Sequence, residues 1–193
     1  MKLLLATHNE HKRREFARLL IGHEVLGLSE EVRLPPEDGE TFAENALGKA
    51  RAAALESGGV AIADDSGIEA AALGGAPGVR SARYAGEHAS DEENLRKLLR
   101  EAPAGSRLEY VCAIAYVDPV AGVERVFEER CAGRLATEVR GQKGFGYDPA
   151  FLPDDGPAGL TIAELSDAQK DAISHRGRAA RGLLEWLEKI DRG

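Results

Sequence analysis

Two adjacent aspartates, Asp64 and Asp65, directly follow a short apolar run at residues 60–63 and precede Ser66 and Gly67. Successive side chains of a strand point to opposite faces, so the two carboxylates cannot share one role unless the chain turns here. Mg²⁺ is usually held by one or two carboxylates together with water and substrate phosphates. The pair therefore indicates a metal site, and an Asx turn that binds no ligand is an equal alternative.

A second group of carboxylates lies at residues 37–40, immediately before a segment with a helical pattern. A carboxylate from this loop could complete a metal site with Asp65, and Glu37 and Glu40 are the two candidates. Without further information, these residues favour the simpler interpretation of a solvated acidic loop.

Polar and basic side chains also gather between the first apolar run and the helical pattern that follows it, namely Thr7, His8, Asn9, Glu10, His11 and Lys12. A helix N-terminus offers free N–H groups and the positive end of the helix dipole, which suits a phosphate. Lys12 falls in the first turn, where a cation is unfavourable unless an anion lies near. The segment lacks the spacing of a P-loop, and by itself it favours an ordinary N-cap with solvated charges.

The segment Phe145, Gly146, Tyr147 and Asp148 places two aromatic residues within three positions of a chain that has five Phe, four Tyr and one Trp. Aromatic faces stack on nucleic-acid bases, and the neighbouring glycines allow a planar ligand to approach the backbone. An alternative of equal weight is a turn whose aromatic rings fill the core.

A last polar group consists of Lys170 and the segment Ser174, His175, Arg176 and Gly177. Lys and Arg can bind phosphate or donate hydrogen bonds to the carbonyl groups of a base. Ser174 is also a good N-cap residue, so these residues by themselves favour a helix start with surface charges.

The composition excludes several classes of protein. A hydrophobic fraction of 43% with 30% charged residues is typical of a globular chain. The net charge of −8 opposes binding to a phosphate backbone, and no run approaches the roughly 18 apolar residues of a membrane span. We therefore expect no nucleic-acid or membrane partner and a cytoplasmic location.

Cys112 and Cys131 form no CxxC motif and no disulfide framework, so reduced structural thiols are expected.

The elements that must position these residues can be predicted from periodicity and capping signals. Two capping boxes, Thr41-x-x-Glu44 and Ser90-x-x-Glu93, open helices. Strands are expected at residues 2–6, 24–28, 60–63, 107–118 and 123–132, and the last two should form a hairpin. Helices are expected at residues 10–22, 41–57, 90–101 and along the apolar stripe that ends at Ile190. Loops are expected at residues 30–39, 74–83 and 141–149.

Early alternation of strands and helices followed by a hairpin predicts an α/β fold, with one mixed-sheet domain over residues 1–193 and two lobes around a central active-site cleft. Ligands of open α/β sheets usually bind at strand ends.

Taken together, the segments resemble the inosine/xanthosine triphosphate pyrophosphatase family, whose members remove deaminated purine nucleotides. The matching segments follow the family's order and span nearly the whole chain: Thr7-x-Asn9-x-x-Lys12, Glu40-Thr41-Phe42-x-Glu44-Asn45-Ala46 with Lys49-Ala50, Ala61–Gly67, Leu73–Gly78, Ser81–Tyr84, Gly144–Pro149 and Ser174–Gly177. His8 departs from the pattern, because the family often has glycine there. The hairpin at residues 107–133 carries little of the family's signature.

The resemblance implies Mg²⁺-dependent hydrolysis of ITP, dITP and XTP to the monophosphate and pyrophosphate, usually by a homodimer. It assigns catalysis to Asp65 and Lys49, and the metal to Asp65 and Glu37, with Glu40 as the competitor to Glu37. It assigns substrate binding to residues 7–12, Ser66, residues 145–148, Lys170, His175 and Arg176. A related pyrophosphatase for other modified nucleotides and a non-catalytic nucleotide sensor remain alternatives, and a nucleic-acid-binding module is the weakest one.

Overall fold

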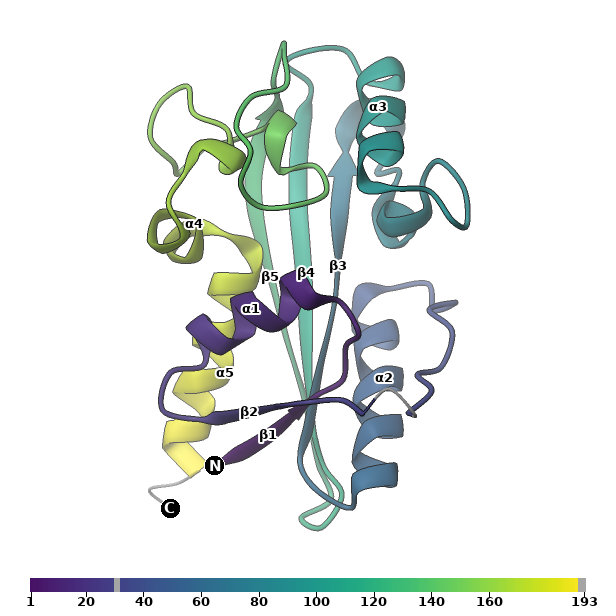
Figure 1. Ribbon diagram of the computed structural model, residues 1–193, viewed down its shortest axis with the longest axis vertical. Helices are drawn as coiled ribbons and strands as arrows, with labels where there is room; N and C mark the ends of the chain where they lie inside the picture. The colour runs from purple at the N-terminus through teal and green to yellow at the C-terminus, as the bar shows by residue number, and fades with distance from the viewer. Residues whose placement is uncertain (30–31, 191–193) are drawn as a thin grey trace. The chain divides into compact units, whose positions relative to one another are not determined.

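The computed structural model describes residues 1–29 and 32–190, so the first two residues of the loop expected at 30–39 lie outside the described residues. The strands are β1 (Lys2–Leu5), β2 (Glu24–Gly27), β3 (Ala61–Ala70), β4 (Arg107–Asp118), β5 (Val123–Leu135) and β6 (Phe151–Pro153). The α-helices are α1 (Glu10–Leu19), α2 (Phe42–Ser57), α3 (Asp91–Glu101), α4 (Asp167–Ile173) and α5 (His175–Ile190) (Figure 1). Short 3₁₀ helices cover Ala71–Leu73, Gly78–Arg83, Asp148–Ala150 and Ile162–Glu164.

The strands form one sheet in the order β2-β1-β3-β4-β5-β6. β1 runs parallel to both β2 and β3, whereas β5 and β6 are antiparallel. β4 and β5 are neighbours joined by residues 119–122, which is the expected hairpin. The predicted mixed-sheet α/β fold is therefore confirmed.

The chain divides into two compact units, which match the two expected lobes. The first unit contains Met1–Asp65, Cys112–Glu129 and Arg176–Gly193, and the second contains Ser66–Val111 and Arg130–His175. Strands β3, β4 and β5 each contribute residues to both units. The cleft expected between the lobes stays a prediction.

Each unit has its own hydrophobic core. In the first unit, Phe16 and Leu20 from the α1 region pack with Leu183 and Leu187 of α5 around side chains of β1, β3 and β4. Helix α2 covers its strands with small residues that include Ala46, Ala50 and Ala53. The scarcity of aromatic residues thus corresponds to a core built mostly from aliphatic side chains.

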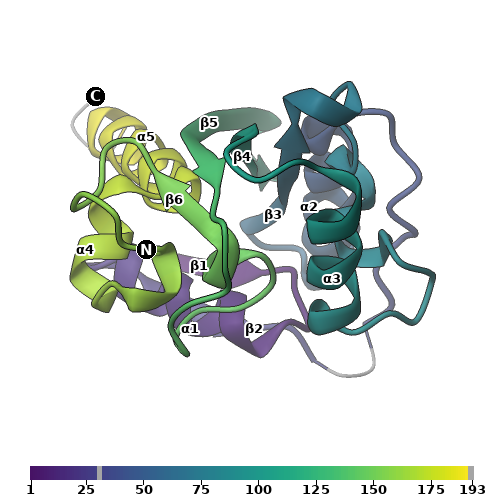
Figure 2. The ribbon, with the colours of Figure 1, turned by 90° about the horizontal axis from the view of Figure 1, so that it is seen from above.

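In the second unit, Leu95 and Leu98 of α3 pack with Ile68, Tyr110 and Phe151 from its strands. Figure 2 shows that α3 lies towards the β3 side of these strands and α4 towards the β6 side. Cys112 and Cys131 form no disulfide and are buried, one in each core, and burial raises the pKa of the Cys112 thiol to about 12. The expectation of structural thiols is confirmed.

The largest error of the sequence prediction concerns β3. A strand was expected to end at residue 63, with an Asx turn at the aspartates as one alternative, but β3 continues through both aspartates to Ala70. Buried carboxylates are costly in a strand unless they are paired. Here Asp64 and Asp65 are both buried and both contact basic or amide side chains from elsewhere in the chain.

Two further elements were not expected. Strand β6 has three residues, too few for an alternating pattern, and it forms only by pairing with the end of β5. Helix α4 begins after a capping box between Ser166 and Gln169, a signal that was present in the sequence but was not used. Among residues 1–29 and 32–190, no helix combines the length and the apolar character needed to cross a bilayer.

Candidate active site

Asp64 and Asp65 take part in separate sets of contacts within the first unit. The strand does not turn between them, so their side chains leave it on opposite faces. Asp65 contacts residues of α2, whereas Asp64 contacts residues of α1 and α5. The expectation that the two carboxylates cannot share one role therefore agrees with their geometry.

The Asp65 carboxylate is held by two side chains of α2. Asn45 Nδ2 donates a hydrogen bond of 2.9 Å to Asp65 Oδ2, and Lys49 Nζ lies 4.0 Å from Asp65 Oδ1. Lys49 also donates to the backbone carbonyl of Asp64 at 2.7 Å. Asn45 and Lys49 lie four residues apart and so share one face of the helix. That face is set by the capping box in which Thr41 and Glu44 fix the start of α2.

Of the two candidate loop carboxylates, the structure brings Glu37 to this group. Lys49 Nζ donates a very short hydrogen bond to Glu37 Oε1. Glu40 is exposed, and its backbone N–H donates to Glu44 in the capping box. Glu37 is about one third exposed, so the interpretation of this loop as fully solvated is wrong for Glu37.

Burial and charge shift the proton affinities of this group in a consistent way. Burial raises the pKa of Asp65 above its ordinary value and Glu37 adds to the rise, although Lys49 opposes it. Burial opposes the charge of Lys49, but the surrounding carboxylates outweigh burial and raise the pKa of Lys49. Asp65 is therefore a better proton acceptor than an exposed aspartate, beside a lysine that stays charged.

The donor set fits Mg²⁺. Glu37 and Asp65 are two carboxylates that both lie beside the Lys49 ammonium, and burial, with a contribution from Glu37, raises the pKa of Asp65. Within residues 1–29 and 32–190, no three Asp, Glu, His or Cys side chains gather into a complete metal site. Mg²⁺ typically takes only one or two protein carboxylates and completes its shell with water and substrate phosphates. Glu37 and Asp65 are the residues that would hold it.

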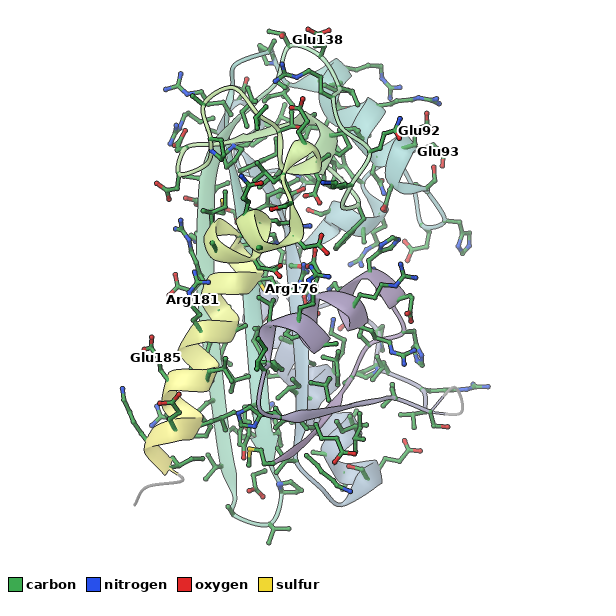
Figure 3. All side chains as sticks on the ribbon, turned by 60° about the vertical axis from the view of Figure 1, so that its left-hand side comes forward. Glu92, Glu93, Glu138, Arg176, Arg181 and Glu185 are labelled. Carbon is green, nitrogen blue, oxygen red and sulfur yellow. The ribbon has the colours of Figure 1, made fainter. Side chains whose placement is uncertain are left out.

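Asp64 lies at the centre of a buried ionic network. Lys12 Nζ of α1 lies 3.0 Å from Asp64 Oδ2, and Arg176 of α5 donates to the same oxygen from Nη2 at 3.0 Å and from Nε at 3.2 Å. Arg176 Nη1 also donates to Glu15 of α1 at 2.5 Å. Figure 3 shows the Arg176 side chain directed towards α1, whereas Arg181 and Glu185 point away from it.

This network is almost closed to solvent and is matched in charge. Asp64 is 0% exposed and Arg176 1% exposed. Burial would raise the pKa of Asp64, but Lys12, Arg176 and Lys49 outweigh burial and hold it below its ordinary value. Burial likewise opposes the charge of Arg176, and Asp64 and Glu15 raise its pKa in spite of burial. Arg176 therefore joins α5 to α1 and β3, and its predicted contact with a base stays a prediction.

The expected phosphate segment at residues 7–12 has the predicted N-cap. Asn9 Oδ1 accepts from the backbone N–H groups of His11 and Lys12 at 2.9 and 3.2 Å, and Thr7 Oγ1 accepts from Asn9 N. Glu10 and His11 are exposed, as is His8, which is within hydrogen-bond distance of the Val32 carbonyl. Lys12 is the member of this segment that points to the aspartates, so the interpretation of all its charges as solvated is wrong for Lys12.

The predicted base-binding residues form a buried group in the second unit. Lys170 Nζ of α4 donates to Asp148 Oδ2 at 2.8 Å, and Phe145 N donates to the same oxygen at 3.0 Å. Lys170 Nζ also lies 5.1 Å from the centre of the Phe145 ring. Lys170 and His175 are buried rather than surface charges, so the simpler interpretation of this segment as an exposed helix start is wrong.

The two aromatic residues of this loop differ in their surroundings. Tyr147 is buried in the core of the second unit and donates from its hydroxyl to the Ser81 carbonyl at 2.7 Å, which favours the core-filling alternative for Tyr147. Phe145 is half-buried, so its ring remains a candidate for stacking on a base. At Gly144, with φ of 72°, a Cβ atom would lie 2.0 Å from Asp148 Oδ2. The glycine is thus needed for the close approach of Asp148.

The adjacent residues His175 and Arg176 belong to different groups. The His175 ring stacks on Tyr110 in the second unit, whereas Arg176 joins the ionic network of the first unit. Ser66, the residue that follows Asp65, belongs to the second unit and is half-buried. The expected phosphate-side residues thus gather in the first unit and the expected base-side residues, apart from Arg176, in the second.

Sequence reasoning missed three residues of these groups: Glu15, Asn45 and Tyr110. Glu15 is an acidic residue beside Phe16 on the apolar face of α1, a charge out of pattern that could have indicated a buried partner. Asn45 lies four positions before Lys49, so helical periodicity could have found it. Tyr110 lies in a strand and carried no signal that distinguishes it from any other core residue.

Comparisons with known proteins agree with this combination of fold and site. The profile of the Ham1 family matches residues 3–186. The chain is 48% identical to a dITP/XTP pyrophosphatase of Cutibacterium acnes over 95% of this chain and 94% of that protein. It is 47% identical to a dITP/XTP pyrophosphatase of Mycolicibacterium paratuberculosis over 98% of this chain and 97% of that protein.

Solved structures agree as well. A HAM1 protein from Coxiella burnetii superposes with a TM-score of 0.86 at 38% identity and covers 98% of this chain and 99% of its own. The Ham1 protein of Staphylococcus aureus superposes with a TM-score of 0.85 at 39% identity, covering 98% of this chain and 100% of its own. The fold and site define an α/β protein with paired aspartates on a central strand. The chain belongs to the Ham1 family.

Proposed function

We propose that this chain is a nucleoside triphosphate pyrophosphatase that hydrolyses ITP, dITP and XTP to the monophosphate and pyrophosphate. The observation that carries the proposal is the buried Asp65 carboxylate, whose pKa is raised beside the charged Lys49 and the carboxylate of Glu37. Relatives that are 48% and 47% identical bear the name dITP/XTP pyrophosphatase, which supports this substrate class.

In the proposed reaction, Asp65 accepts a proton from the attacking water while the water oxygen bonds to the phosphorus nearest the sugar. The bond from this phosphorus to the bridging oxygen breaks, and pyrophosphate leaves with that oxygen. Asn45 holds one carboxylate oxygen of Asp65, which fixes the orientation of the other. Lys49, beside Asp65, and Lys12, beside Asp64, would offset the charge of the phosphates.

We further propose Mg²⁺ as the cofactor, held by Glu37 and Asp65. When bound, Mg²⁺ would polarise the phosphate oxygens and offset the charge of the leaving group. Glu40 is the weaker candidate, because its side chain is exposed and its backbone belongs to the start of α2.

Base selection requires donors that favour a carbonyl group at position six, as in hypoxanthine and xanthine, over the amine of adenine. Mispaired polar groups in a buried site can discriminate strongly. We assign this role first to Lys170 and His175, which are both buried; Lys170 lies beside the half-buried Phe145 ring. Arg176 is a weaker candidate, because its guanidinium already binds Asp64 and Glu15.

The test is pyrophosphate release with Mg²⁺ from a panel of inosine, xanthosine, adenosine, guanosine and methylated pyrimidine triphosphates. We expect fast release from the first two and loss of release when the metal is chelated. Asp65→Asn keeps the size of the side chain and its ability to accept from Asn45, but it removes the proton acceptor. We expect its turnover to fall by roughly 10²–10⁴-fold, with little change in the free energy of unfolding.

Each outcome of the panel is informative. Release from another base would support Asp65 and Lys49 but contradict the base assignment. Tight binding without release would favour a nucleotide sensor, and near-native turnover of Asp65→Asn would contradict the catalytic assignment.

Gel filtration and sedimentation would test the proposed homodimer. The proposals of a cytoplasmic location and of no nucleic-acid partner rest on the composition and the net charge of −8.

A further inference from the structure

Asp148 is the centre of the buried group in the second unit, and it is saturated by donors of this chain. Lys170 Nζ and Phe145 N donate to Asp148 Oδ2, and the Tyr110 hydroxyl donates to Oδ1 at 3.0 Å. Asp148 is 3% exposed. A carboxylate with its oxygens so engaged organises its neighbours and is a poor candidate for direct contact with a nucleotide.

Tyr110 connects this carboxylate to the imidazole of His175. Its ring stacks on the His175 ring with a centroid distance of 4.5 Å and an angle of 5° between the planes. The Phe151 ring lies 4.6 Å from Tyr110 at an angle of 43° and packs against the same ring. Tyr110 itself is buried in the core of the second unit. It therefore touches the residues proposed to bind the base without being exposed to a ligand.

We propose that Tyr110 is a positioning residue for base recognition: its ring fixes the plane of His175, and its hydroxyl fixes Asp148, which anchors Lys170 and the Phe145 loop. This inference rests on the proposed function, because it deepens the base-binding role of Lys170 and His175. It concerns a position in the hairpin, the part of the chain that carries little of the family's sequence signature.

The chemistry of the tyrosine suits this role. Burial, together with the neighbouring Asp148 carboxylate, raises the pKa of Tyr110 well above its ordinary value, so its hydroxyl remains a donor at every working pH. A phenylalanine would keep the stack on His175 and lose the hydrogen bond, whereas a leucine would lose both. The two substitutions therefore separate the contribution of the hydroxyl from that of the ring.

The experiment compares Tyr110→Phe and Tyr110→Leu with the wild type in kcat and KM for ITP and in calorimetric binding of inosine monophosphate. The loss of a hydrogen bond to a charged group corresponds to a factor of roughly ten or more in the equilibrium that positions its partner. We expect Tyr110→Phe to raise KM and the Kd of inosine monophosphate about ten-fold, with kcat within about three-fold of the wild type. Tyr110→Leu should raise both constants further, so that the phenylalanine variant is a partial rescue.

Two controls separate positioning from a general structural effect. Tyr116→Phe removes a hydroxyl from another buried tyrosine of β4, one that packs in the first unit against Trp186, and should leave both constants unchanged. Inorganic tripolyphosphate carries no base, so its inhibition constant should be the same in Tyr110→Phe and the wild type. Thermal unfolding of every variant checks that the folded state is retained.

The inference would be overturned if Tyr110→Phe weakened the binding of tripolyphosphate and of inosine monophosphate equally. It would also be overturned if Tyr110→Phe had the KM and Kd of the wild type, or if only its kcat were reduced. If the wild type releases pyrophosphate from no triphosphate, the proposed function fails, and binding of inosine monophosphate alone decides the role of Tyr110. A wild type that neither hydrolyses triphosphates nor binds the monophosphate would overturn both.

Discussion

The surroundings of two adjacent carboxylates in one strand shift their pKa values in opposite directions. Lys12, Arg176 and Lys49 outweigh burial and lower the pKa of Asp64, whereas burial and Glu37 raise the pKa of Asp65. The physical difference is the charge on each face of β3. Lys12 and Arg176 converge on Asp64 within 3.0 Å, and a single lysine lies 4.0 Å from Asp65. Asp64 is thereby suited to stabilise the fold as a charged group, and Asp65 is suited to accept a proton.

The role of Asp64 predicts a pH-dependent loss of stability in Asp64→Asn. The folded-state pKa of Asp64 is lowered, so its carboxylate stabilises the fold above the unfolded-state pKa of about 3.9 and loses this effect as the pH falls through the folded-state pKa. At pH 7 the substitution leaves Lys12 and Arg176 without this partner and should reduce the free energy of unfolding by about 3–5 kcal/mol. Urea unfolding at pH 7, 5 and 3.5 measures the difference, which should shrink below about pH 4.

The matched control is Asp154→Asn, which removes an exposed carboxylate paired with Arg107 at 2.8 Å. Such a surface pair contributes about 0–1 kcal/mol, so the control should remain close to the wild type at every pH. A difference between Asp64→Asn and the wild type that stayed constant from pH 7 to pH 3.5 would contradict the electrostatic explanation.

At the scale of elements, the helices present their functional residues because their starts are fixed. The capping boxes at Thr41 and Ser90 were predicted and both are present. The box at Thr41 sets the phase of α2, and that phase directs Asn45 and Lys49 to β3. Periodicity could not predict the extent of β3, because its polar residues are paired only by side chains distant in the chain.

Thr41→Ala and Ser90→Ala should therefore each lower the free energy of unfolding by about 1 kcal/mol. Of the two, Thr41→Ala alone should also reduce turnover, because α2 carries Lys49 whereas α3 carries none of the proposed catalytic residues. Denaturant unfolding and pyrophosphate release measured on both variants test this. Equal losses of turnover in the two variants would argue against a specific role of α2.

At the scale of the whole molecule, the chain distributes its chemistry over two units with separate cores. Asp65, Lys49, Glu37 and Lys12 belong to the first unit, and Phe145, Lys170 and His175 belong to the second. The first unit is thus the proposed phosphate and metal side, and the second is the proposed base side.

Thermal unfolding with Mg²⁺ and a nucleotide analogue tests whether the protein alone supplies too few ligands to bind the metal tightly. Only Glu37 and Asp65 are assigned to Mg²⁺, so Mg²⁺ alone should raise Tm little. Mg²⁺ together with an inosine triphosphate whose α–β bridging oxygen is replaced by a methylene group should raise it clearly, with a stabilisation of about 2.7 kcal/mol at 100 times Kd.

Two conservative substitutions control this measurement. Glu37→Gln should diminish the combined shift of Tm, whereas Glu40→Gln should leave it unchanged, because the Glu40 side chain is exposed. A full shift with Mg²⁺ alone would indicate a metal site complete within the protein. An effect of Glu40→Gln equal to that of Glu37→Gln would contradict the assignment of Glu37.

The sequence by itself determined the local order of this protein: the capped helices, the hairpin, the mixed sheet and the family, since these depend on periodicity, capping residues and short motifs. It also indicated that Asp64 and Asp65 cannot share one role within a strand, because a strand alternates its faces. Only the tertiary structure decided which charges are buried, since that depends on partners such as Glu15, Asn45 and Tyr110 that lie far away in the chain. A pattern along the sequence can indicate that a residue faces the interior, but it does not identify the distant residue that pairs with it.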